Sequence, residues 1–456
     1  MKFSLTNIGK IAQADIEING LTVLGGYNDI GKSTVGKTLF SVIKTVSNRE
    51  QELAGEKVEQ AEQKINSFYV QIRKITGFRP GLPLSEEEYN ESKLKKKARI
   101  FESVTFYIDK MRKELWFMLG EQPDVRESIT LFLKKMREDF QTIITISEED
   151  SGIATKVSGL LDILENDIQE ALETENDESY KYRKVFDRIN ESLFRGSMQN
   201  KIASTVISKI IVEDDSCKIN IELENEHTNI FETDENFPFR DVTLIESPLL
   251  LGWSSAVGGV TQRELFRPNN RGRSAFGHYV FDLLSKVQYS TLDDYHSLFT
   301  PPIIHKINEV IGGQMYYDRK KSDFFFKQKK MTNKAVNLAS GIKTFGIIQM
   351  LLISGMIVPD TVLIIDEPEA HLHPEWQLKY AEVITQLVDM GVYVLVSTHS
   401  PYMIEALKHY SEKLQQEKIT NFYLGGAGEH GTIFSDVTQD LNPLFELLAK
   451  PMRRLM

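Results

Sequence analysis

The sequence predicts an α/β fold in which a mixed sheet, partly parallel, is covered by helices and interrupted by a helical insertion. Short apolar runs separated by Gly9-Lys10 and Asn19-Gly20 open the chain and lead into a glycine-rich loop. After residue 337, helix and buried strand alternate, which is typical of a parallel sheet between helices. Residues 48–197 are charged and helical in pattern. We therefore expect three segments, at 1–47, 48–197 and 198–456.

Composition narrows the class of protein. The chain has 456 residues, of which 41% are hydrophobic and 10% aromatic, enough for a sizeable core. Its net charge of −11 argues against a protein that coats nucleic acid with its whole surface. The single cysteine, Cys217, cannot form an internal disulfide, and no apolar signal core or bilayer-length stretch is evident. We expect a cytoplasmic protein with no membrane contact.

The predicted insertion carries apolar residues spaced by three and four, a pattern that buries one stripe of a helix against another. Two such seams are present, one over Ile65, Phe68, Ile72 and Ile75, the other over Phe101, Val104, Ile108, Met111, Leu115 and Met118. A turn is expected at 77–83. Interruptions at Gly77, Pro80, Pro83, Pro123 and Gly152 favour a compact helical bundle over one long coiled coil.

The remaining elements follow in order. The first 25 residues are predicted to form short strands, and further strands are predicted at 208–212, 218–223 and 242–245. A loop is expected at 263–273, a helix at 277–287 and a hairpin at 314–327. Helices at 341–357 and 374–390 then alternate with strands at 361–365 and 393–397.

The loop Gly26-Tyr27-Asn28-Asp29-Ile30-Gly31-Lys32-Ser33 fits the phosphate-binding P-loop pattern and stands between a strand and a helix. Its glycines let the backbone curl so that amides and the helix N-terminus face the phosphates, while Lys32 neutralises phosphate charge and Ser33 offers a hydroxyl to Mg²⁺. A glycine-rich turn that matches by chance is the alternative. We expect ATP and Mg²⁺, with nucleotide contacts from Gly26, Asn28, Gly31, Lys32, Ser33 and Thr34.

Two apolar strands end in side chains that can bind a metal ion or transfer protons. Asp366 and Glu367 follow the strand 361–365, at the sheet edge where open α/β sheets bind ligands. Asp366 is expected to bind Mg²⁺ together with Ser33, and Glu367 to polarise the attacking water. His399 ends the next strand, where it can hydrogen-bond a γ-phosphate. An acidic turn and a structural histidine are the alternatives. We expect Glu367, His399 and Lys32 to be catalytic.

A signature segment, Ser340 to Lys343, precedes a long apolar helix. Ser340 and Gly341 then stand at a helix N-terminus, which attracts anions, and Lys343 adds positive charge. We expect all three to contact nucleotide. An ordinary helix start with Ser340 as its N-cap is the simpler interpretation, and the two are compatible.

In this order the motifs resemble those of ABC-type ATPases. Asp366-Glu367-Pro368-Glu369 with Ala370-His371-Leu372-His373-Pro374, then Ser397-Thr398-His399-Ser400-Pro401, are similar to the SMC/RecF-related ATPases of the overcoming-lysogenization-defect branch. That branch includes the ATPase subunits of antiphage systems such as Septu and PARIS. The resemblance covers roughly residues 1–45 and 200–440. It implies an ABC-type P-loop NTPase fold with mixed-sheet lobes and a helical insertion.

The resemblance also implies a face-to-face dimer, in which Ser340, Gly341 and Lys343 of one subunit face the γ-phosphate held by Lys32 and Ser33 of another. A hexamer built from such dimers stays open. Two features depart from the family pattern: the signature lacks its fuller Leu-Ser-Gly-Gly-Gln form, and Glu246-Ser247-Pro248 stands where a Q-loop glutamine is expected. Gln262 is a remote candidate for that glutamine.

The expected function is that of an ATP-hydrolysing subunit that controls a separate effector. Because the segment after His399 holds one or two strands and a terminal helix, a nuclease activity is expected to belong to a partner chain. The main alternative is an SMC/RecF-like DNA repair or recombination ATPase; an ATP-gated scaffold and a transporter subunit are others. Nucleic acid or a phage protein is a further partner, because basic clusters at 93–99, 263–273 and 319–330 either bind phosphates or form solvated faces.

Overall fold

The computed structural model describes residues 1–76, 134–135, 137–138, 151–172, 177–200, 207–234, 236–252, 277–292, 301–370 and 372–453. Two compact units make up the chain. The first comprises Met1–Arg49, Asp177–Thr261 and Arg271–Met456, and the second Glu50–Asn176 and Gln262–Asn270. Residues 177–197, which we placed in the insertion, thus belong to the first unit. The division at 47 and 197 stays a prediction.

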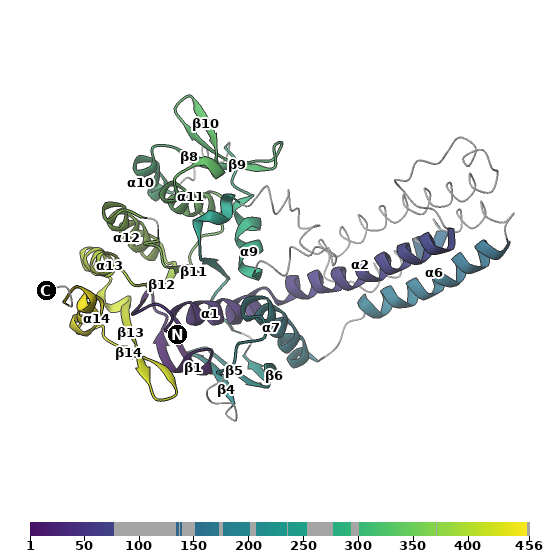
Figure 1. The fold of residues 1–456 in the computed structure, drawn as a ribbon, viewed down its shortest axis with the longest axis horizontal. Coiled ribbons are helices and arrows are strands. Elements are labelled where there is room, and N and C mark those ends of the chain that lie inside the picture. Colours follow the sequence, from purple (N-terminus) through teal and green to yellow (C-terminus); the bar gives the residue numbers. More distant parts are fainter. Residues whose placement is uncertain are drawn as a thin grey trace. The chain divides into compact units, whose positions relative to one another are not determined.

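An eleven-stranded mixed sheet forms the centre of the first unit (Figure 1). In spatial order the strands are β6 (His227–Thr233), β5 (Cys217–Glu224), β4 (Ser208–Asp214), β1 (Lys2–Ile8), β2 (Ile11–Glu17), β14 (Gly431–Asp436), β13 (Thr420–Gly428), β3 (Leu21–Gly25), β12 (Tyr393–Thr398), β11 (Thr361–Asp366) and β7 (Asp241–Ile245). From β13 to β7 all neighbours are parallel, whereas β6 to β2 are antiparallel. The predicted α/β class with a mixed sheet is confirmed.

Burial explains the difference between the two halves of the sheet. Every residue of β3 is buried, as are the first five of β11, because strands of a parallel sheet are covered on both faces. In β5, buried positions alternate with exposed or half-buried ones, the pattern of a sheet with one solvated face. Helix α1 (Lys32–Ser47) packs on β7, β11 and β12, and α12 (Pro374–Asp389) packs on β12 and α13 (Pro401–Lys413).

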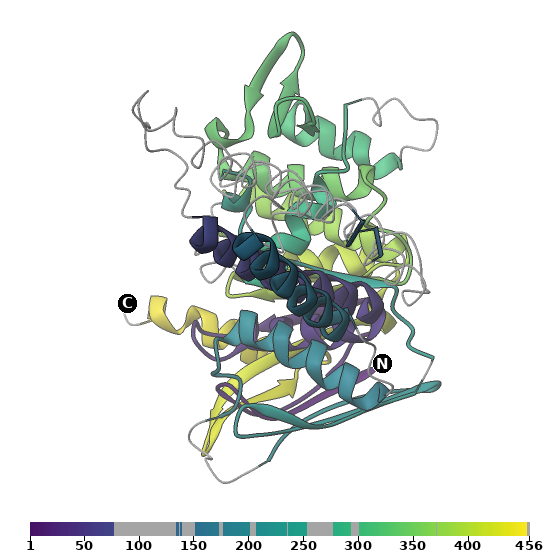
Figure 2. The same cartoon turned by 90° about the vertical axis from the view of Figure 1, so that its right-hand side faces the viewer.

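A second group of elements surrounds helix α11 (Ser340–Ile353), whose neighbours include η2 (Pro248–Gly252), α9 (His278–Val287) and α10 (Pro302–Ile311). A three-stranded sheet of β8 (Gln314–Asp318), β9 (Asp323–Gln328) and β10 (Met331–Lys334) lies beside them (Figure 2). The predicted hairpin is confirmed as β8 and β9. The exposed strand β10 has no apolar pattern that could have predicted it. Helix α11 ends four residues before the predicted boundary, and Gly355 beyond it has φ 69°.

The other predicted elements can be compared with the structure in the same way. The predicted strands after residue 197 correspond to β4, β5 and β7, and the predicted helix at 277–287 to α9. Helix α7 (Glu178–Phe194) and helix α14 (Asn442–Arg453) complete the first unit, with short 3-10 turns η5 (Ala335–Asn337) and η6 (Glu417–Ile419). The predicted turn at 77–83, the 101–118 seam, the loop at 263–273 and Gln262 lie outside the described residues.

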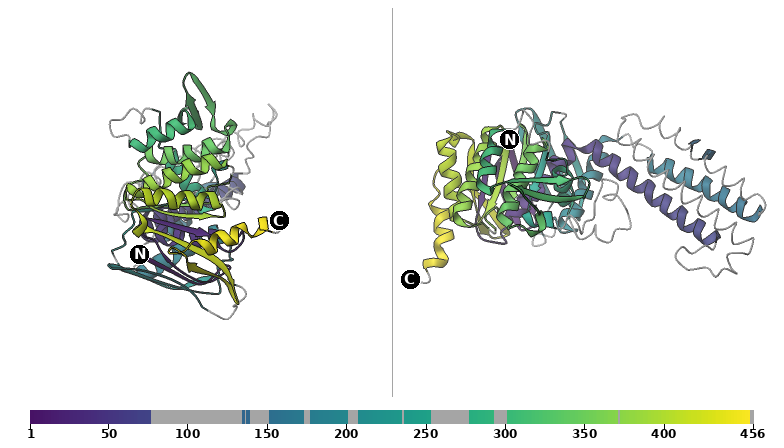
Figure 3. Two further views of the ribbon diagram at one scale, coloured as in Figure 1. Left: turned by 90° about the vertical axis from the view of Figure 1, so that its left-hand side faces the viewer. Right: turned by 90° about the horizontal axis from the view of Figure 1, so that it is seen from above.

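The second unit contains two long helices, α2 (Arg49–Thr76) and α6 (Ser151–Leu172), which lie side by side in Figures 1 and 3. Ile65 and Phe68 of the predicted seam are buried, as are Leu164 and Ile168 of α6. An ion pair of 3.4 Å joins Lys64 to Asp167. Within the described ranges, no helix has both the length and the apolar character that crossing a bilayer requires.

A buried cluster of four charges ties α1 to the sheet. The ammonium of Lys44 lies 2.6 Å from Asp282 and 3.3 Å from Asp241, and that of Lys286 lies 2.8 Å and 2.7 Å from the same carboxylates. Burial alone would raise the pKa of Asp282, but Lys286 and Lys44 outweigh it and lower the pKa from 3.8 to about 2. Two positive and two negative charges thus balance where an unpaired charge would be costly.

Asp282→Asn is expected to lower the free energy of unfolding by about 3–5 kcal/mol, because it leaves buried ammonium groups with one carboxylate fewer. Denaturation in urea at pH 7 measures this loss. Because the folded-state pKa is depressed, the carboxylate's contribution is present above pH 3.8 and disappears as the pH falls through about 2. Asp389→Asn, at an exposed position on α12, is the control and should change stability by less than about 0.5 kcal/mol. Equal stability of the two variants would contradict the assignment.

Candidate functional site

The P-loop joins β3 to α1, and its backbone takes conformations that only glycine adopts easily. Gly26 has φ 144° and Gly31 has φ 94°. A Cβ atom at Gly26 would lie 2.4 Å from Ile30 Cδ1, and one at Gly31 2.9 Å from Ile11 Cγ1. The loop therefore curls tightly onto the N-terminus of α1, whose first turn contains Ser33 and Thr34. Asn28 is exposed on the loop.

Lys32 turns back into the loop. Its Nζ donates hydrogen bonds to the carbonyl oxygens of Gly26 at 3.1 Å and Tyr27 at 2.7 Å, and the residue is 4% exposed. Burial lowers the pKa of Lys32, whereas the negative charges of Glu367, Asp366 and Glu369 oppose that shift. The lysine thus lies in the field of three carboxylates that come from a distant part of the sequence.

The sheet register explains this proximity. β3, β12 and β11 are parallel neighbours, so Gly25 is opposite Thr398 and Ser397 is opposite Asp366 at one edge, which we call the phosphate edge. Asp366 accepts a hydrogen bond from Ser397 Oγ. Glu367 takes a positive φ of 47° and donates its N–H to the carbonyl of Ser397 at 2.8 Å, and its side chain is 38% exposed.

His399 contacts two acidic residues of the phosphate edge. Its Nδ1 lies 3.5 Å from Glu367 Oε1 and 3.1 Å from Glu369 Oε1, and its side chain is 41% exposed. Glu369 is almost completely buried and was not among the predicted site residues. The doubled acidic pattern of Asp-Glu-Pro-Glu could have indicated it, but only the fold brings its carboxylate to the histidine.

A family comparison matches residues 1–404 to the AAA ATPase domain. The chain belongs to the AAA ATPase domain family. Among solved structures, an SmcHead bound to the C-winged helix domain of ScpA is similar at 10% identity over 99% of this chain and 98% of that one, with a TM-score of 0.39. The SMC head domain from Thermotoga maritima shares 11% identity over 51% and 73%, with a TM-score of 0.29. No curated protein matches the chain.

In this AAA ATPase domain the signature segment, Ser340 to Lys343, forms the first turn of helix α11. Helix α11 begins at Ser340, and the N-cap is Ala339, which makes no side-chain cap; the prediction that Ser340 is the N-cap is wrong. A Cβ atom at Gly341 would lie 2.9 Å from Trp376 Cε3, so this glycine permits close packing on α12. Lys343 is 5% exposed and donates to the carbonyl of Val336 at 3.1 Å, and burial lowers the pKa of its ammonium.

The predicted nucleotide contacts come from two places in the first unit, the phosphate edge and the start of α11. The charged groups that act on Lys32 are the carboxylates of the phosphate edge, whereas the pKa of Lys343 responds to burial alone. The parallel register of β3, β12 and β11 brings Lys32, Asp366, Glu367 and His399 to the same edge of the sheet. Ser340, Gly341 and Lys343 lie in the first turn of α11, where Gly341 packs on Trp376 of α12 and Lys343 donates to the carbonyl of Val336.

The position of the expected Q-loop carries an ion pair. Glu246, directly after β7, lies 2.8 Å from Lys37 of α1. A pocket of about 340 Å³ borders this pair, with Ser247 and Tyr279 among its lining residues. Glu246 thus binds a lysine of the P-loop helix.

The residues predicted to hold Mg²⁺ fit this ion in the chemistry of their donor atoms. Ser33 offers a hydroxyl from the first turn of α1, and Asp366 a carboxylate from the end of β11, both hard oxygen donors. Mg²⁺ commonly binds through one or two protein oxygens and the substrate's phosphates, retaining several waters. The donor set therefore suits a magnesium nucleotide.

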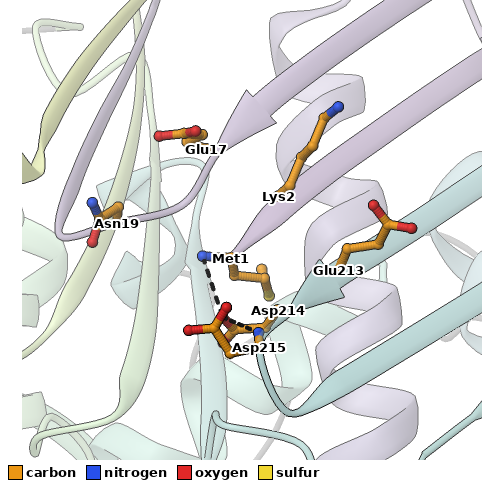
Figure 4. A pocket seen from close by; sticks show the side chains of 7 residues that line it. All are labelled: Met1, Lys2, Glu17, Asn19, Glu213, Asp214 and Asp215. Carbon is orange, nitrogen blue, oxygen red and sulfur yellow. Dashed lines mark hydrogen bonds and ion pairs between the residues drawn. The ribbon is translucent and has the colours of Figure 1, made fainter.

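A separate pocket of about 430 Å³ lies at the N-terminal end of β1 (Figure 4). It is lined by Met1, Lys2, Glu17, Asn19, Glu213, Asp214 and Asp215. The terminal ammonium of Met1 lies 4.0 Å from Asp214. None of the predicted site residues lines this pocket.

Lys32→Ala is expected to weaken ATP binding by about 10- to 100-fold, because charge-assisted hydrogen bonds typically contribute about 1.5–3 kcal/mol. Isothermal titration calorimetry with Mg²⁺ and ATP measures the change. Lys379→Ala, which removes an exposed lysine paired with Glu375 on α12, provides the matched control and should bind as the wild type does. An unchanged affinity in Lys32→Ala would contradict the P-loop assignment.

Proposed function

We propose that this AAA ATPase domain protein hydrolyses ATP with Mg²⁺ and uses the cycle as a dimerising switch that controls a separate effector subunit in an antiphage complex. The observation that carries the ATPase part is the parallel register of β3, β12 and β11, which brings Lys32 into the field of Asp366, Glu367 and Glu369 at the phosphate edge. A P-loop facing a strand that ends in carboxylates is what phosphoryl transfer to water requires. Family membership supports the same activity.

The proposed roles follow from position and exposure. Lys32 neutralises phosphate charge, and the curled P-loop presents amides at the start of α1. Ser33 and Asp366 would hold Mg²⁺, which when bound would further neutralise the charge of the phosphates. The half-exposed carboxylate of Glu367 is accessible to a water molecule, whose proton it can accept. His399 adjoins Glu367, which suits contact with the γ-phosphate.

The dimer part of the proposal rests on the signature segment. The N-terminus of α11 carries the positive end of a helix dipole, and Ala339 offers it no side-chain acceptor. Trp376 holds the first turn in place by packing on Gly341. We propose that this helix N-terminus approaches the γ-phosphate of a second copy, with Lys343 turning away from Val336 to join it.

The effector part rests on the resemblance of the motifs to antiphage ATPase subunits, and the 48–197 segment is the proposed recognition module. Co-purification of the chain with the products of neighbouring genes, followed by mass spectrometry, tests this part directly. Recovery of a nuclease supports effector control. Recovery of recombination proteins instead supports the second function below.

A second function, action on DNA, is favoured by the charge of the β8–β10 sheet. Its basic residues are Arg319, Lys320, Lys321, Lys327, Lys329, Lys330 and Lys334. Among its acidic residues, Asp318 pairs with Lys321 and Asp323 with Lys334. Phe324, Phe325 and Phe326 are buried, so this surface offers charge and not rings for base stacking. Stimulation of ATP turnover by duplex DNA would favour this function.

Glu367→Gln is expected to slow ATP hydrolysis by about 10²–10⁴-fold, because it removes the carboxylate that accepts a proton from water. ATP affinity should stay within about threefold, since Lys32 and Asp366 remain. Phosphate release and calorimetry provide the two measurements. The control is Glu405→Gln, an exposed change of the same kind on α13. Wild-type turnover in Glu367→Gln would remove this residue from the proposed chemistry.

Mixing two inactive variants tests the composite site. Ser340→Arg is expected to bind ATP without hydrolysing it, and Lys32→Ala to offer an intact signature segment without holding nucleotide. Their mixed dimer contains one intact composite site, so ATPase activity should reappear on mixing and rise with the mixed-dimer fraction. Normal activity of Ser340→Arg alone, independent of protein concentration, would contradict the composite site.

A further inference from the structure

Helix α14 packs directly on the start of the P-loop, a contact that no proposed role yet uses. Leu444 of α14 is fully buried, and a Cβ atom at Gly25, the last residue of β3, would lie 2.6 Å from its Cδ1. Two residues further along the loop, the hydroxyl of Tyr27 donates a hydrogen bond to the carbonyl of Leu447 at 3.0 Å. The helix thus contacts the loop by apolar packing and by one directed hydrogen bond.

The sequence of α14 explains why this carbonyl is available. In an α-helix the carbonyl of residue 447 accepts a hydrogen bond from the N–H of residue 451. Residue 451 is Pro451, which has no N–H, although α14 continues to Arg453. The carbonyl of Leu447 therefore lacks its usual helical donor, and a backbone carbonyl without a partner is costly. The hydroxyl of Tyr27 provides the hydrogen bond instead.

The backbone of the same tyrosine contacts the P-loop lysine. The carbonyl of Tyr27 accepts a hydrogen bond from Lys32 Nζ at 2.7 Å, and the carbonyl of Gly26 accepts another at 3.1 Å. A lysine ammonium has three N–H groups, so the loop binds two of them. Because the three groups are arranged tetrahedrally, the two carbonyl oxygens determine the direction of the third, which is the one left for a phosphate oxygen.

The far end of the loop is held by packing and not by such a bond. Cβ atoms at Gly26 and at Gly425 of β13 would each lie 2.4 Å from Ile30 Cδ1, so Ile30 fills the space beside two glycines. Tyr27, by contrast, is 39% exposed, and exposed side chains change rotamer readily. The position of Tyr27 therefore depends on its hydrogen bond to α14.

We infer that Tyr27 is a positioning residue of the nucleotide site: its hydroxyl is anchored on α14, at the carbonyl that Pro451 leaves unpaired, and its own carbonyl orients Lys32 toward the phosphates. This inference rests on the proposed ATP site of the P-loop. Tyr27 acts through the lysine and not by touching the substrate. Helix α14, which lies outside the sequence motifs, thus becomes part of the support of the site.

Tyr27→Phe removes only the hydroxyl, and calorimetry with Mg²⁺ and ATP measures the effect. ATP affinity should fall by about 2- to 10-fold, the range for one neutral hydrogen bond. In steady-state turnover the loss should appear in the KM for ATP more than in kcat, because the lysine already binds the phosphates in the ground state. A purely structural role would lower the active fraction and leave KM unchanged. Unchanged affinity and KM in Tyr27→Phe would overturn the inference.

Two double-mutant cycles test the two ends of this chain of contacts. In the Lys32→Ala background, Tyr27→Phe should change ATP affinity by less than about twofold, because its effect passes through the lysine. Pro451→Ala restores a helical N–H that competes for the carbonyl of Leu447, so it should also weaken ATP binding. Combined with Tyr27→Phe, it should weaken binding by less than the product of the two separate losses. Independent, multiplicative losses in either cycle would contradict the positioning role.

Hydrogen–deuterium exchange of residues 26–33 measures the anchor without nucleotide. Amide exchange in the loop should be faster in Tyr27→Phe and in Pro451→Ala than in the wild type, because loss of the anchor makes local opening easier. Equal exchange in all three proteins would overturn the inference. A wild-type protein that binds no ATP would refute the proposed function, whereas the exchange measurement would still decide whether α14 holds the loop.

The matched controls make the same chemical changes elsewhere. Tyr402→Phe lies at a 57% exposed position on α13, and Pro443→Ala lies in the first turn of α14. A proline in the first turn of a helix leaves no helical carbonyl unpaired, because the N–H groups there have no helical partner. Both variants should keep wild-type ATP affinity and loop exchange. A loss in either as large as that of Tyr27→Phe would contradict the assignment.

Discussion

The register of three parallel strands is the constraint on which the site depends. β3, β12 and β11 end at the same edge of the sheet, so a loop near residue 30, an acidic turn near residue 367 and a histidine at residue 399 become neighbours. A slip of one residue between β11 and β12 would turn every side chain of the shifted strand to the other face and separate Asp366 from Ser397. Because these strands are apolar on both faces, burial alone does not select one register, and the polar contacts at the strand ends do: Ser397 Oγ donates to Asp366, and the N–H of Glu367 donates to the carbonyl of Ser397.

Around this edge, buried charged side chains repeatedly lie next to groups of opposite charge. Lys32 is buried against loop carbonyls and lies in the field of three carboxylates, and further along α1 Lys44 belongs to a balanced cluster with Asp282. Both ends of α1 are thus bound to neighbouring elements by charge as well as by apolar contacts. Such groups contribute more to a specific arrangement than to net stability, since their desolvation is costly. The start of α1 therefore has a defined position against β11 and β12.

The signature segment is held in place by apolar packing and not by pairs of buried opposite charges. Its glycine permits contact with Trp376, which joins the N-terminus of α11 to α12, the helix that follows the acidic turn. Phe345 continues this contact through edge-on packing on Trp376 and Tyr380. The two motifs of one chain are consequently linked through a packed helix, although they occupy separate surroundings. In the proposed dimer, this link would connect the phosphate edge of one site with the signature of the other.

The sequence alone determined the α/β class, most strands of the parallel half and the residue types of the phosphate edge, because apolar runs, glycine spacing and strand-end carboxylates are local properties. It did not indicate β10, whose residues are all exposed, or the packing of α7 in the first unit. Only the tertiary structure decided that Lys32 lies in the field of Asp366, Glu367 and Glu369, that Gly341 packs on Trp376 and that Glu369 meets His399. These features depend on which distant groups share a buried space, and local patterns carry no information about such partners.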